Sequence, residues 1–327
     1  MPDMTVVAEA RALVTQGRVA LAFDMLSQAV EKGDDRAAAE LADWRMRGSV
    51  IRRDLPESRR LYELAARSGN AEALDAHIAL MAIGAGGTGR DWPRAVETLR
   101  ESVHPRHIEQ CALLAGMSID ALGNPAAPVS AEIRHRSPYV ATISAFLTSC
   151  ECDYLSQLAR PLLKPSQVFD PATRTSFQHP ERTASAAVFP FVRENPVLHA
   201  INRRIAAATG TTYEQGEPLQ VLSYSAGDQY RLHIDSDPRE VNPRLYTLLV
   251  YLNDGYEGGE THFPHIDWSF KGRTGDAIIF RSLREDGQIE RRSAHAGLPV
   301  TAGKKLVLSK WIRQRPLDLS GPPGRPF

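Results

Sequence analysis

The sequence contains few cysteines and carries no excess of charge of either sign. Three cysteines in 327 residues are too few for a disulfide framework, and they fit a reducing cytoplasm. Lys plus Arg and Asp plus Glu both number 39, so the net charge is +0. A neutral chain argues against a broad surface for nucleic acid or anionic lipid. Cys150 and Cys152 resemble half of a zinc site, but no second Cys/His pair lies nearby, so free thiols are expected.

Long apolar runs are also missing. No run approaches the roughly 20 residues that a membrane-spanning helix needs. The first residues, MPDMTVVAEARALV, contain acidic side chains and no basic segment before an apolar core, unlike a secretory signal. We therefore expect a cytoplasmic protein that has neither a membrane nor a nucleic acid as its partner.

The first third of the chain is rich in Ala, Leu and Arg, and it repeats. Residues 29–34 are echoed by residues 65–70, and the pair Arg53-Asp54 is echoed by Arg90-Asp91. A period in roughly the mid-thirties with small residues at helix contacts indicates helix–turn–helix units stacked into an α-solenoid. Such repeats commonly present a surface to a protein partner, although they can also serve only to cover a second domain.

After a break at residues 124–128 (NPAAP), the pattern changes to short strands. The expected elements are a strand at 138–143, helices at 152–163 and 196–208, and strands at 219–224, 246–253, 277–280 and 305–311. Many short strands separated by turns favour a double-stranded β-helix, or jelly roll. We therefore predict an α+β protein of two domains. Their bounds are a helical-repeat domain at 1–123, a linker at 124–137, a jelly roll with flanking helices at 138–315, and a flexible tail at 316–327.

The segment His233-Ile234-Asp235, with His295 farther along the chain, provides two imidazoles and one carboxylate. This is the ligand set of non-haem iron(II) oxygenases. Alternate side chains of a β-strand share a face, so we expect His233 and Asp235 to point the same way. A histidine from a distant strand then completes three ligands and leaves metal positions open for a co-substrate and O2.

The sequence around these ligands resembles a known family. Tyr224 begins the pattern Y-x-x-G-x-x-Y-x-x-H-x-D, which is followed by GGETHFP from Gly258, GDA from Gly275, and SAHAGLPV, with Gly303 and Lys305 beyond. An RTAS segment lies upstream, at 182–185. In this order the blocks resemble the prolyl 4-hydroxylase branch of the 2-oxoglutarate/Fe(II) dioxygenases, over about residues 138–315. Residues 15–105 resemble Sel1-like repeats, which are related to tetratricopeptide repeats.

The resemblance implies roles for individual residues. His233, Asp235 and His295 would bind Fe(II). Lys305 would bind the far carboxylate of 2-oxoglutarate as a compact positive charge, while its neighbour Lys304 is expected to be a solvated surface lysine.

Four further residues match the family pattern less specifically. Tyr224 and Thr261 would support the same carboxylate, and Tyr230 would be a second tyrosine of the catalytic pocket. Arg244 matches an arginine near the peptide site, although an exposed arginine at a strand edge is equally compatible with the sequence. His262 is expected to point away from the pocket, because it follows the inward-facing Thr261.

The implied reaction is oxidative decarboxylation of 2-oxoglutarate by O2 to succinate and CO2, coupled to hydroxylation of a substrate C–H bond, with L-ascorbate as reductant. Asp235 favours hydroxylation, because related halogenases carry a small residue in its place. A prolyl residue of a protein or peptide is the expected substrate. Two alternatives remain: a free amino acid or small natural product, and a non-catalytic protein-interaction module that acts through the helical repeats.

Overall fold

The computed structural model describes residues 5–87, 89–170, 175–178 and 181–317. The chain divides into two compact units. Of the described residues, the helical unit contains those up to Asn124 and Pro190–Ile201, and the sheet unit contains those from Pro125 to Phe189 and from Asn202 to Leu317. Most of the predicted tail, from residue 318 onward, lies outside the described residues.

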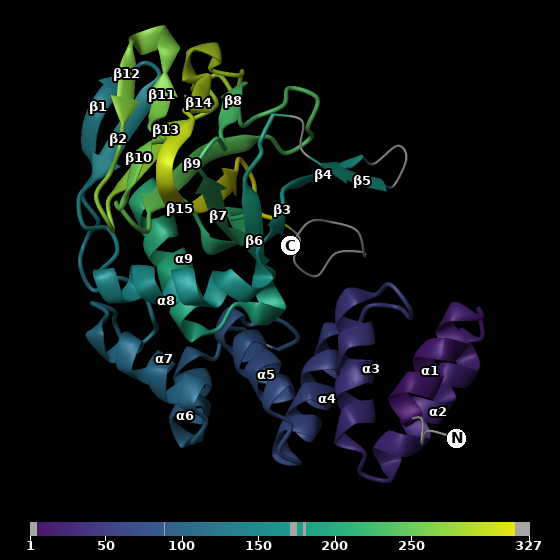
Figure 1. The fold of residues 1–327 in the computed structure, drawn as a ribbon. Coiled ribbons are helices and arrows are strands. Elements are labelled where there is room, and N and C mark those ends of the chain that lie inside the picture. The colour runs from purple at the N-terminus through teal and green to yellow at the C-terminus, as the bar shows by residue number, and fades with distance from the viewer. Residues whose placement is uncertain (1–4, 88, 171–174, 179–180, 318–327) are drawn as a thin grey trace. The chain divides into compact units, whose positions relative to one another are not determined.

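Before residue 124 the described part of the helical unit consists of helices joined by short turns. They are α1 (Val6–Thr15), α2 (Val19–Glu31), α3 (Asp35–Arg47), α4 (Leu55–Arg67), α5 (Ala71–Ile83), α6 (Trp92–Glu101) and α7 (Pro105–Gly116). Each helix packs against the next one along the chain, as Figure 1 shows. Small residues such as Ala22, Ala38 and Ala65 are fully buried, which lets neighbouring helices approach closely.

The helix ends repeat along this unit. Helix α3 begins at Asp35 and α5 begins at Ala71, a spacing of 71 − 35 = 36 residues. In both helices the side chain of the preceding residue, Asp34 or Asn70, accepts a hydrogen bond from a first-turn backbone N–H, which stabilises the helix start. Both helices end at a glycine with a left-handed backbone. These equivalences support a repeat of this length, and its identification as a Sel1-like repeat stays a prediction.

The sheet unit contains two antiparallel sheets in the part of the chain that the structure describes. The larger sheet has the strand order β1-β2-β13-β9-β15-β7-β6-β3, with β10 paired to β15, and the smaller has the order β12-β11-β14-β8. The strands of the larger sheet are β1 (Glu132–Arg136), β2 (Tyr139–Ile143), β3 (Lys164–Pro165), β6 (Ser185–Phe189), β7 (Leu219–Ser225), β9 (Arg244–Tyr251), β10 (Tyr256–Gly258), β13 (Ala277–Arg281) and β15 (Val300–Arg313). Those of the smaller sheet are β8 (Tyr230–His233), β11 (Thr261–Phe263), β12 (Trp268–Phe270) and β14 (His295–Gly297), and β4 (Gln167–Asp170) forms a hairpin with β5 (Thr175–Gln178).

This arrangement is consistent with the predicted jelly roll. Buried side chains from both sheets, among them Phe263 of β11 and Phe280 of β13, form one apolar cluster. The predicted strands at 138–143, 219–224, 246–253, 277–280 and 305–311 correspond to β2, β7, β9, β13 and β15. The predicted ligands His233 and His295 therefore lie in strands of the small sheet, and Lys305 lies in the large one.

Helices α8 (Ser149–Ala159) and α9 (Pro196–Thr209) account for the two predicted helices of this region. Helix α8 begins three residues earlier than expected because Thr148 and Glu151 form a reciprocal capping box. Its last predicted residues form a 3-10 turn at Arg160–Leu162 instead, since Pro161 has no backbone N–H to continue the helix. Among the described residues, no helix is both long and apolar enough to cross a membrane.

Candidate metal centre and co-substrate pocket

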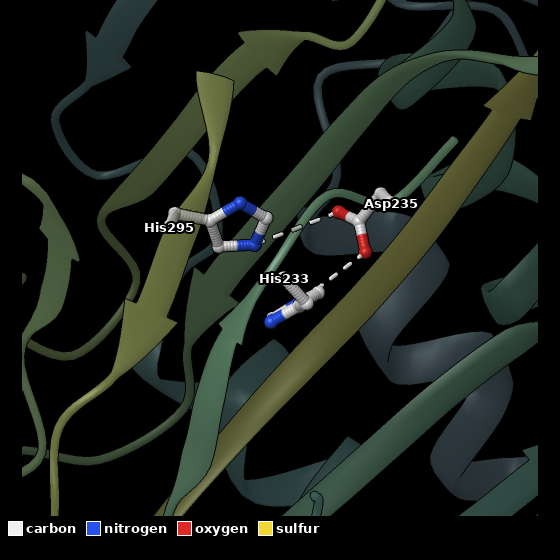
Figure 2. A group of neighbouring side chains, drawn as sticks. All are labelled: His233, Asp235 and His295. Carbon is white, nitrogen blue, oxygen red and sulfur yellow. Dashed lines mark ion pairs between the residues drawn. The ribbon is translucent and has the colours of Figure 1, made fainter. Parts of the chain in front are cut away.

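Three side chains of the sheet unit converge as the sequence predicted. His233 ends β8, His295 begins β14, and the two are direct partners across the antiparallel strand pair. Asp235 lies between the two imidazoles. Its Oδ1 is 3.4 Å from His233 Nε2, and its Oδ2 is 3.6 Å from His295 Nε2. Figure 2 shows all three side chains turned toward a common point. Among the described residues these three form the group of His, Cys, Asp or Glu that could hold a metal ion.

The expectation that His233 and Asp235 share a face of one strand is wrong in one respect, because β8 ends at His233. Asp235 follows in a bend. Its carboxylate is directed by Thr247 of β9 instead, whose hydroxyl donates to Asp235 Oδ2 at 2.6 Å. The convergence of the motif therefore depends on a side chain of the larger sheet.

The environment of the two imidazoles fits a metal. His233 Nδ1 lies 2.7 Å from the carbonyl oxygen of Arg231, and His295 Nδ1 lies 3.1 Å from that of Ser293. A carbonyl oxygen only accepts, so each Nδ1 carries the proton and each Nε2 keeps a free electron pair. His233 Nε2 is buried without a hydrogen-bond partner, as expected of a nitrogen that binds a metal ion.

The charges of the site fit a divalent cation as well. Burial and then His233 lower the pKa of His295, Asp235 raises it in part, and the resulting pKa is about 4, so this imidazole is neutral near pH 7. Burial raises the pKa of Asp235, but His295, His233 and Arg244 outweigh burial, and the pKa lies below its ordinary value. The site thus offers two imidazole nitrogens and one carboxylate, and these donors suit Fe(II).

A cavity adjoins the three side chains. One wall is a single face of β15, where Lys305, Val307, Ser309 and Trp311 all line the cavity because alternate residues share a face. Six residues of a strand span about 20 Å. The wall therefore runs from a cationic end at Lys305 to an aromatic end at Trp311.

Lys305 lies at the buried end of this cavity. The residue is 4% exposed, and its Nζ donates to the carbonyl oxygen of Gly259 at 2.7 Å. Burial lowers its pKa, Glu260 raises it in part and Lys271 lowers it, and the resulting pKa is about 8. Among the described residues that line the cavity no carboxylate forms an ion pair with Lys305, so its charge can bind an anionic ligand. Lys304 is exposed, as expected.

The remaining predicted pocket residues also line the cavity. Tyr224 is the cross-strand partner of Lys305, and the Lys305 ammonium lies 5.4 Å from the centre of the Tyr224 ring. Thr261 is buried, and its hydroxyl is 2.9 Å from the hydroxyl of Tyr251. The Tyr230 ring stacks on His233 with ring centres 3.5 Å apart, and burial raises the pKa of Tyr230 to about 12.

Several residues that line the cavity were not predicted from the sequence, among them Trp311 and Arg182. Trp311 forms the aromatic end of the cavity, and Arg182 lies between Trp311 and Tyr230, with its guanidinium 5.9 Å and 5.5 Å from their ring centres. Trp311 could have been found by counting every second residue from Lys305 along the predicted strand. Arg182 belongs to the RTAS segment, but the sequence does not show that the loop brings it to the cavity.

His262 and Arg244 lie outside the cavity. His262 is hydrogen-bonded to Ser269 at 2.8 Å, away from the cavity as predicted. Arg244 is not exposed at a strand edge, because β9 lies between β13 and β15. Its guanidinium pairs with Glu217 at 2.7 Å. Contact between Arg244 and a substrate stays a prediction.

Comparison with known proteins gives four findings. Residues 219–313 match the 2OG-Fe(II) oxygenase superfamily. The chain is 36% identical over 206 residues to prolyl 4-hydroxylase 1 of Arabidopsis thaliana, which covers 57% of this chain and 73% of that protein. It is 31% identical over 206 residues to the prolyl 4-hydroxylase subunit alpha-2 of Gallus gallus, which covers 61% of this chain and 38% of that subunit. A solved structure, the 2OG complex of a viral collagen prolyl hydroxylase from Paramecium Bursaria Chlorella virus-1, matches with 28% identity and a TM-score of 0.43, covering 53% of this chain and 95% of that one.

Proposed function

This chain belongs to the prolyl 4-hydroxylase family of the 2OG-Fe(II) oxygenases, and from this premise we propose that it hydroxylates prolyl residues of a protein or peptide. Fe(II) is the cofactor of this family, and 2-oxoglutarate and O2 are its co-substrates. One observation carries the proposal. The three metal-binding side chains open onto a cavity that has a buried ammonium at one end and aromatic rings at the other.

The side chains have separable tasks in this proposal. His233, Asp235 and His295 hold Fe(II), which when bound supplies the activation of O2 together with 2-oxoglutarate. Lys305 binds the far carboxylate of 2-oxoglutarate, and Tyr224 and Thr261 line the walls beside it. L-Ascorbate as reductant stays a prediction from the family.

The peptide is proposed to bind at the aromatic end. Thr247, which holds Asp235, is the cross-strand partner of Trp311, so this end of the cavity lies beside the metal ligand. The rings of Trp311 and Tyr230 offer flat apolar surfaces that suit a pyrrolidine ring. Arg182 lies close to both rings, where its guanidinium can donate to a peptide carbonyl. A proline bound here would lie beside Asp235, one of the three residues that would hold Fe(II).

The test combines purified protein with Fe(II), 2-oxoglutarate, ascorbate and a panel of proline-containing peptides. We expect succinate release that rises with a suitable peptide, and a peptide that gains one oxygen atom on proline. Asp235→Ala or His295→Ala should abolish both metal retention and turnover. Turnover with free proline but with no peptide would favour a small-molecule hydroxylase, and no succinate release under any condition would contradict the proposed function.

For the helical unit we infer that the repeats recruit a protein, which would be the substrate or its carrier. The supporting observations are the equivalent helix ends of α3 and α5 and the successive packing of α1 to α7. A pull-down that compares the wild-type protein with variants substituted at exposed residues of these helices would test this role. Turnover on short peptides, measured on the same variants, should be unchanged.

A further inference from the structure

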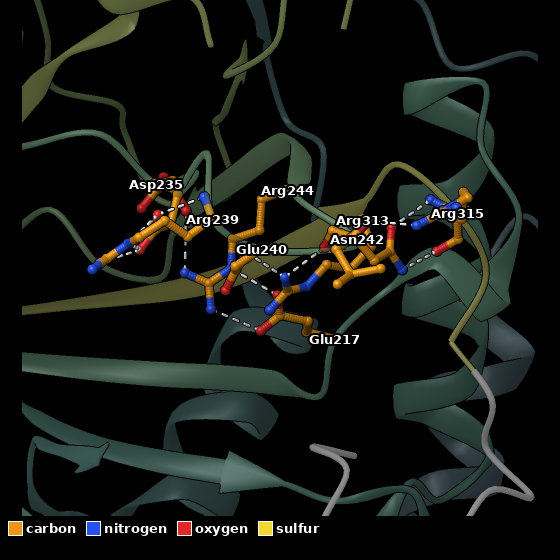
Figure 3. A network of polar contacts seen from close by, with 10 residues as sticks. Glu217, Asp235, Arg239, Glu240, Asn242, Arg244, Arg313 and Arg315 are labelled. Carbon is orange, nitrogen blue, oxygen red and sulfur yellow. Dashed lines mark hydrogen bonds and ion pairs between the residues drawn. The ribbon is translucent and has the colours of Figure 1, made fainter. Parts of the chain in front are cut away.

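A buried carboxylate lies between two arginines next to the metal ligands (Figure 3). Glu217, which precedes β7, is 5% exposed. Arg244 donates to both of its oxygens, from Nε at 2.7 Å and from Nη2 at 2.9 Å. Arg313 Nε lies 2.5 Å from Glu217 Oε1. Burial raises the pKa of Glu217, but the two arginines outweigh burial, so the pKa is lowered and Glu217 is ionised.

Arg244 connects Glu217 to the metal centre. Its Nη1 donates to the main-chain carbonyl of Asp235 at 3.3 Å. The centre of its guanidinium lies 3.7 Å from the centre of the Trp311 ring, close enough for a cation–π contact. The Arg244 guanidinium therefore contacts both the backbone of a metal ligand and the wall of the proposed peptide site. Its bidentate hydrogen bond to Glu217 fixes the plane of the guanidinium.

The loop that follows Asp235, residues 236–243, is held by the same network. Arg313 Nη1 donates to the carbonyl of Asn242 at 2.7 Å and to Glu240 at 2.5 Å. The Asn242 side chain in turn donates to the carbonyl of Arg315 and accepts from its N–H, both at 2.9 Å. The loop is thus tied at its start through Arg244 and at its end through Arg313, and both arginines contact Glu217.

We propose that Glu217 is a positioning residue for the metal site, acting through Arg244 on the backbone of Asp235 and on Trp311. The proposal rests on the proposed function and adds a residue that does not touch metal, co-substrate or peptide. Without the negative charge of Glu217, Arg244 would lose its carboxylate partner and would leave its place above Trp311, whereas Arg313 would keep its pair with Glu240. The Lys305 end of the cavity has no contact with this network among the described residues, so it should not respond.

The test compares Glu217→Gln with Glu214→Gln, an exposed carboxylate three residues away, and with Arg244→Lys. Lysine keeps the charge but cannot form the two-pronged bond or lie flat on the ring. Circular dichroism first checks that each full-length variant is folded. Anaerobic calorimetry then measures the Kd of Co(II), which replaces Fe(II) without turnover, and the Kd of 2-oxoglutarate for the Co(II)-saturated protein.

We expect Glu217→Gln and Arg244→Lys to raise the Co(II) Kd by about 10-fold or more, as loss of support to a metal ligand does. The 2-oxoglutarate Kd should stay within about twofold, and Glu214→Gln should leave both constants unchanged. Wild-type Co(II) affinity in a folded Glu217→Gln variant would overturn the proposal. So would an equal loss of 2-oxoglutarate affinity, or unfolding of both variants, because the network would then serve the fold as a whole. These measurements need no peptide, so their outcome does not depend on whether the proposed prolyl substrate is correct.

Discussion

At the scale of single residues, Lys305 shows how a buried charge is kept ready for a ligand. The ammonium is almost fully enclosed, and a single carbonyl, that of Gly259, accepts its hydrogen bond. A charge in such a place is unfavourable without a counter-ion. A dicarboxylate that enters the cavity provides the counter-ion that the buried ammonium lacks. A neutral ligand cannot do so, and the site therefore favours an anion.

Replacing Lys305 with Ala should weaken 2-oxoglutarate binding far more than metal binding. A hydrogen bond to a charged group contributes about 1.5–3 kcal/mol, which corresponds to a KM for 2-oxoglutarate that rises by about 10- to 150-fold. Steady-state succinate release measures this KM, and Lys304→Ala at the exposed neighbouring position is the control. An unchanged KM in the Lys305 variant would remove Lys305 from the co-substrate site.

The same residue predicts a dependence on pH. Burial lowers the pKa of Lys305 to about 8, so the free protein loses the ammonium charge as the pH rises through that value. The KM for 2-oxoglutarate should therefore be constant below about pH 7.5 and should rise above pH 8, approaching about tenfold per pH unit. A KM that stays flat up to pH 9.5 would contradict this assignment. The KM for peptide at saturating 2-oxoglutarate provides the comparison in the same buffers.

The predictability of the site differs from residue to residue. His233, Asp235, His295, Thr261 and Lys305 occupy short motifs, so sequence alone brings them to one cavity. Trp311 follows from the period of two along the strand of Lys305. Glu217 could not be predicted, because a single glutamate before a strand has no local signature and its two arginines come from β9 and β15.

At the scale of elements, the long strands and helices were predictable and the shortest strands were not. Strands β7, β9 and β13 have apolar patterns long enough to read. The strands β10, β11, β12 and β14 have three residues each, too few to show an alternating pattern. The Thr148-x-x-Glu151 pattern at the start of α8 was present in the sequence and would have corrected its first residue.

The turn before β13 explains the GDA motif physically and gives an element-scale prediction. Gly275 has φ +88°, and a Cβ there would lie 2.1 Å from the carbonyl oxygen of Leu147. Gly275→Ala should therefore lower the free energy of unfolding by about 2–4 kcal/mol, from backbone strain and from a forced shift of the neighbouring chain. Denaturant titration measures this change.

Gly287→Ala is a matched control for this prediction. Gly287 has a similar φ of +79°, but an added Cβ meets nothing closer than 3.6 Å. Only the strain of the left-handed backbone remains, of about 1 kcal/mol. Equal losses in the two variants would show that the contact with Leu147 contributes nothing.

At the scale of the whole molecule, the two compact units are not separated by a single boundary in the sequence. Residues 190–201, which lie between β6 and the second half of α9, belong to the helical unit. Phe191 is part of the apolar core formed by its helices, and the Phe191 ring lies 5.6 Å from the guanidinium of Arg53. The sequence predicts one boundary near residue 124. It does not show that residues 190–201 belong to the helical unit, because their composition does not differ from that of their neighbours.

Deleting residues 1–124 should therefore do more than remove a binding region. The deletion exposes Phe191 and the apolar residues beside it, so we expect a lower Tm and concentration-dependent aggregation of the remaining chain. Scanning calorimetry and gel filtration against the full-length protein test this. A truncated chain that stays monomeric and melts at the full-length temperature would show that residues 190–201 need no helical partner.

The pairing of His233 with His295 across β8 and β14 has a consequence for the order of events during biosynthesis. Both histidines must be made and their strands joined before two nitrogens can face one ion, and their separation along the chain makes this a late contact. We therefore expect iron to bind after β8 and β14 have paired, so that the metal does not guide their pairing. A newly made chain then passes through a folded, metal-free stage. Loading then depends on which divalent ion is available at that moment, since raw affinity for such donors does not favour Fe(II) over the later divalent metals.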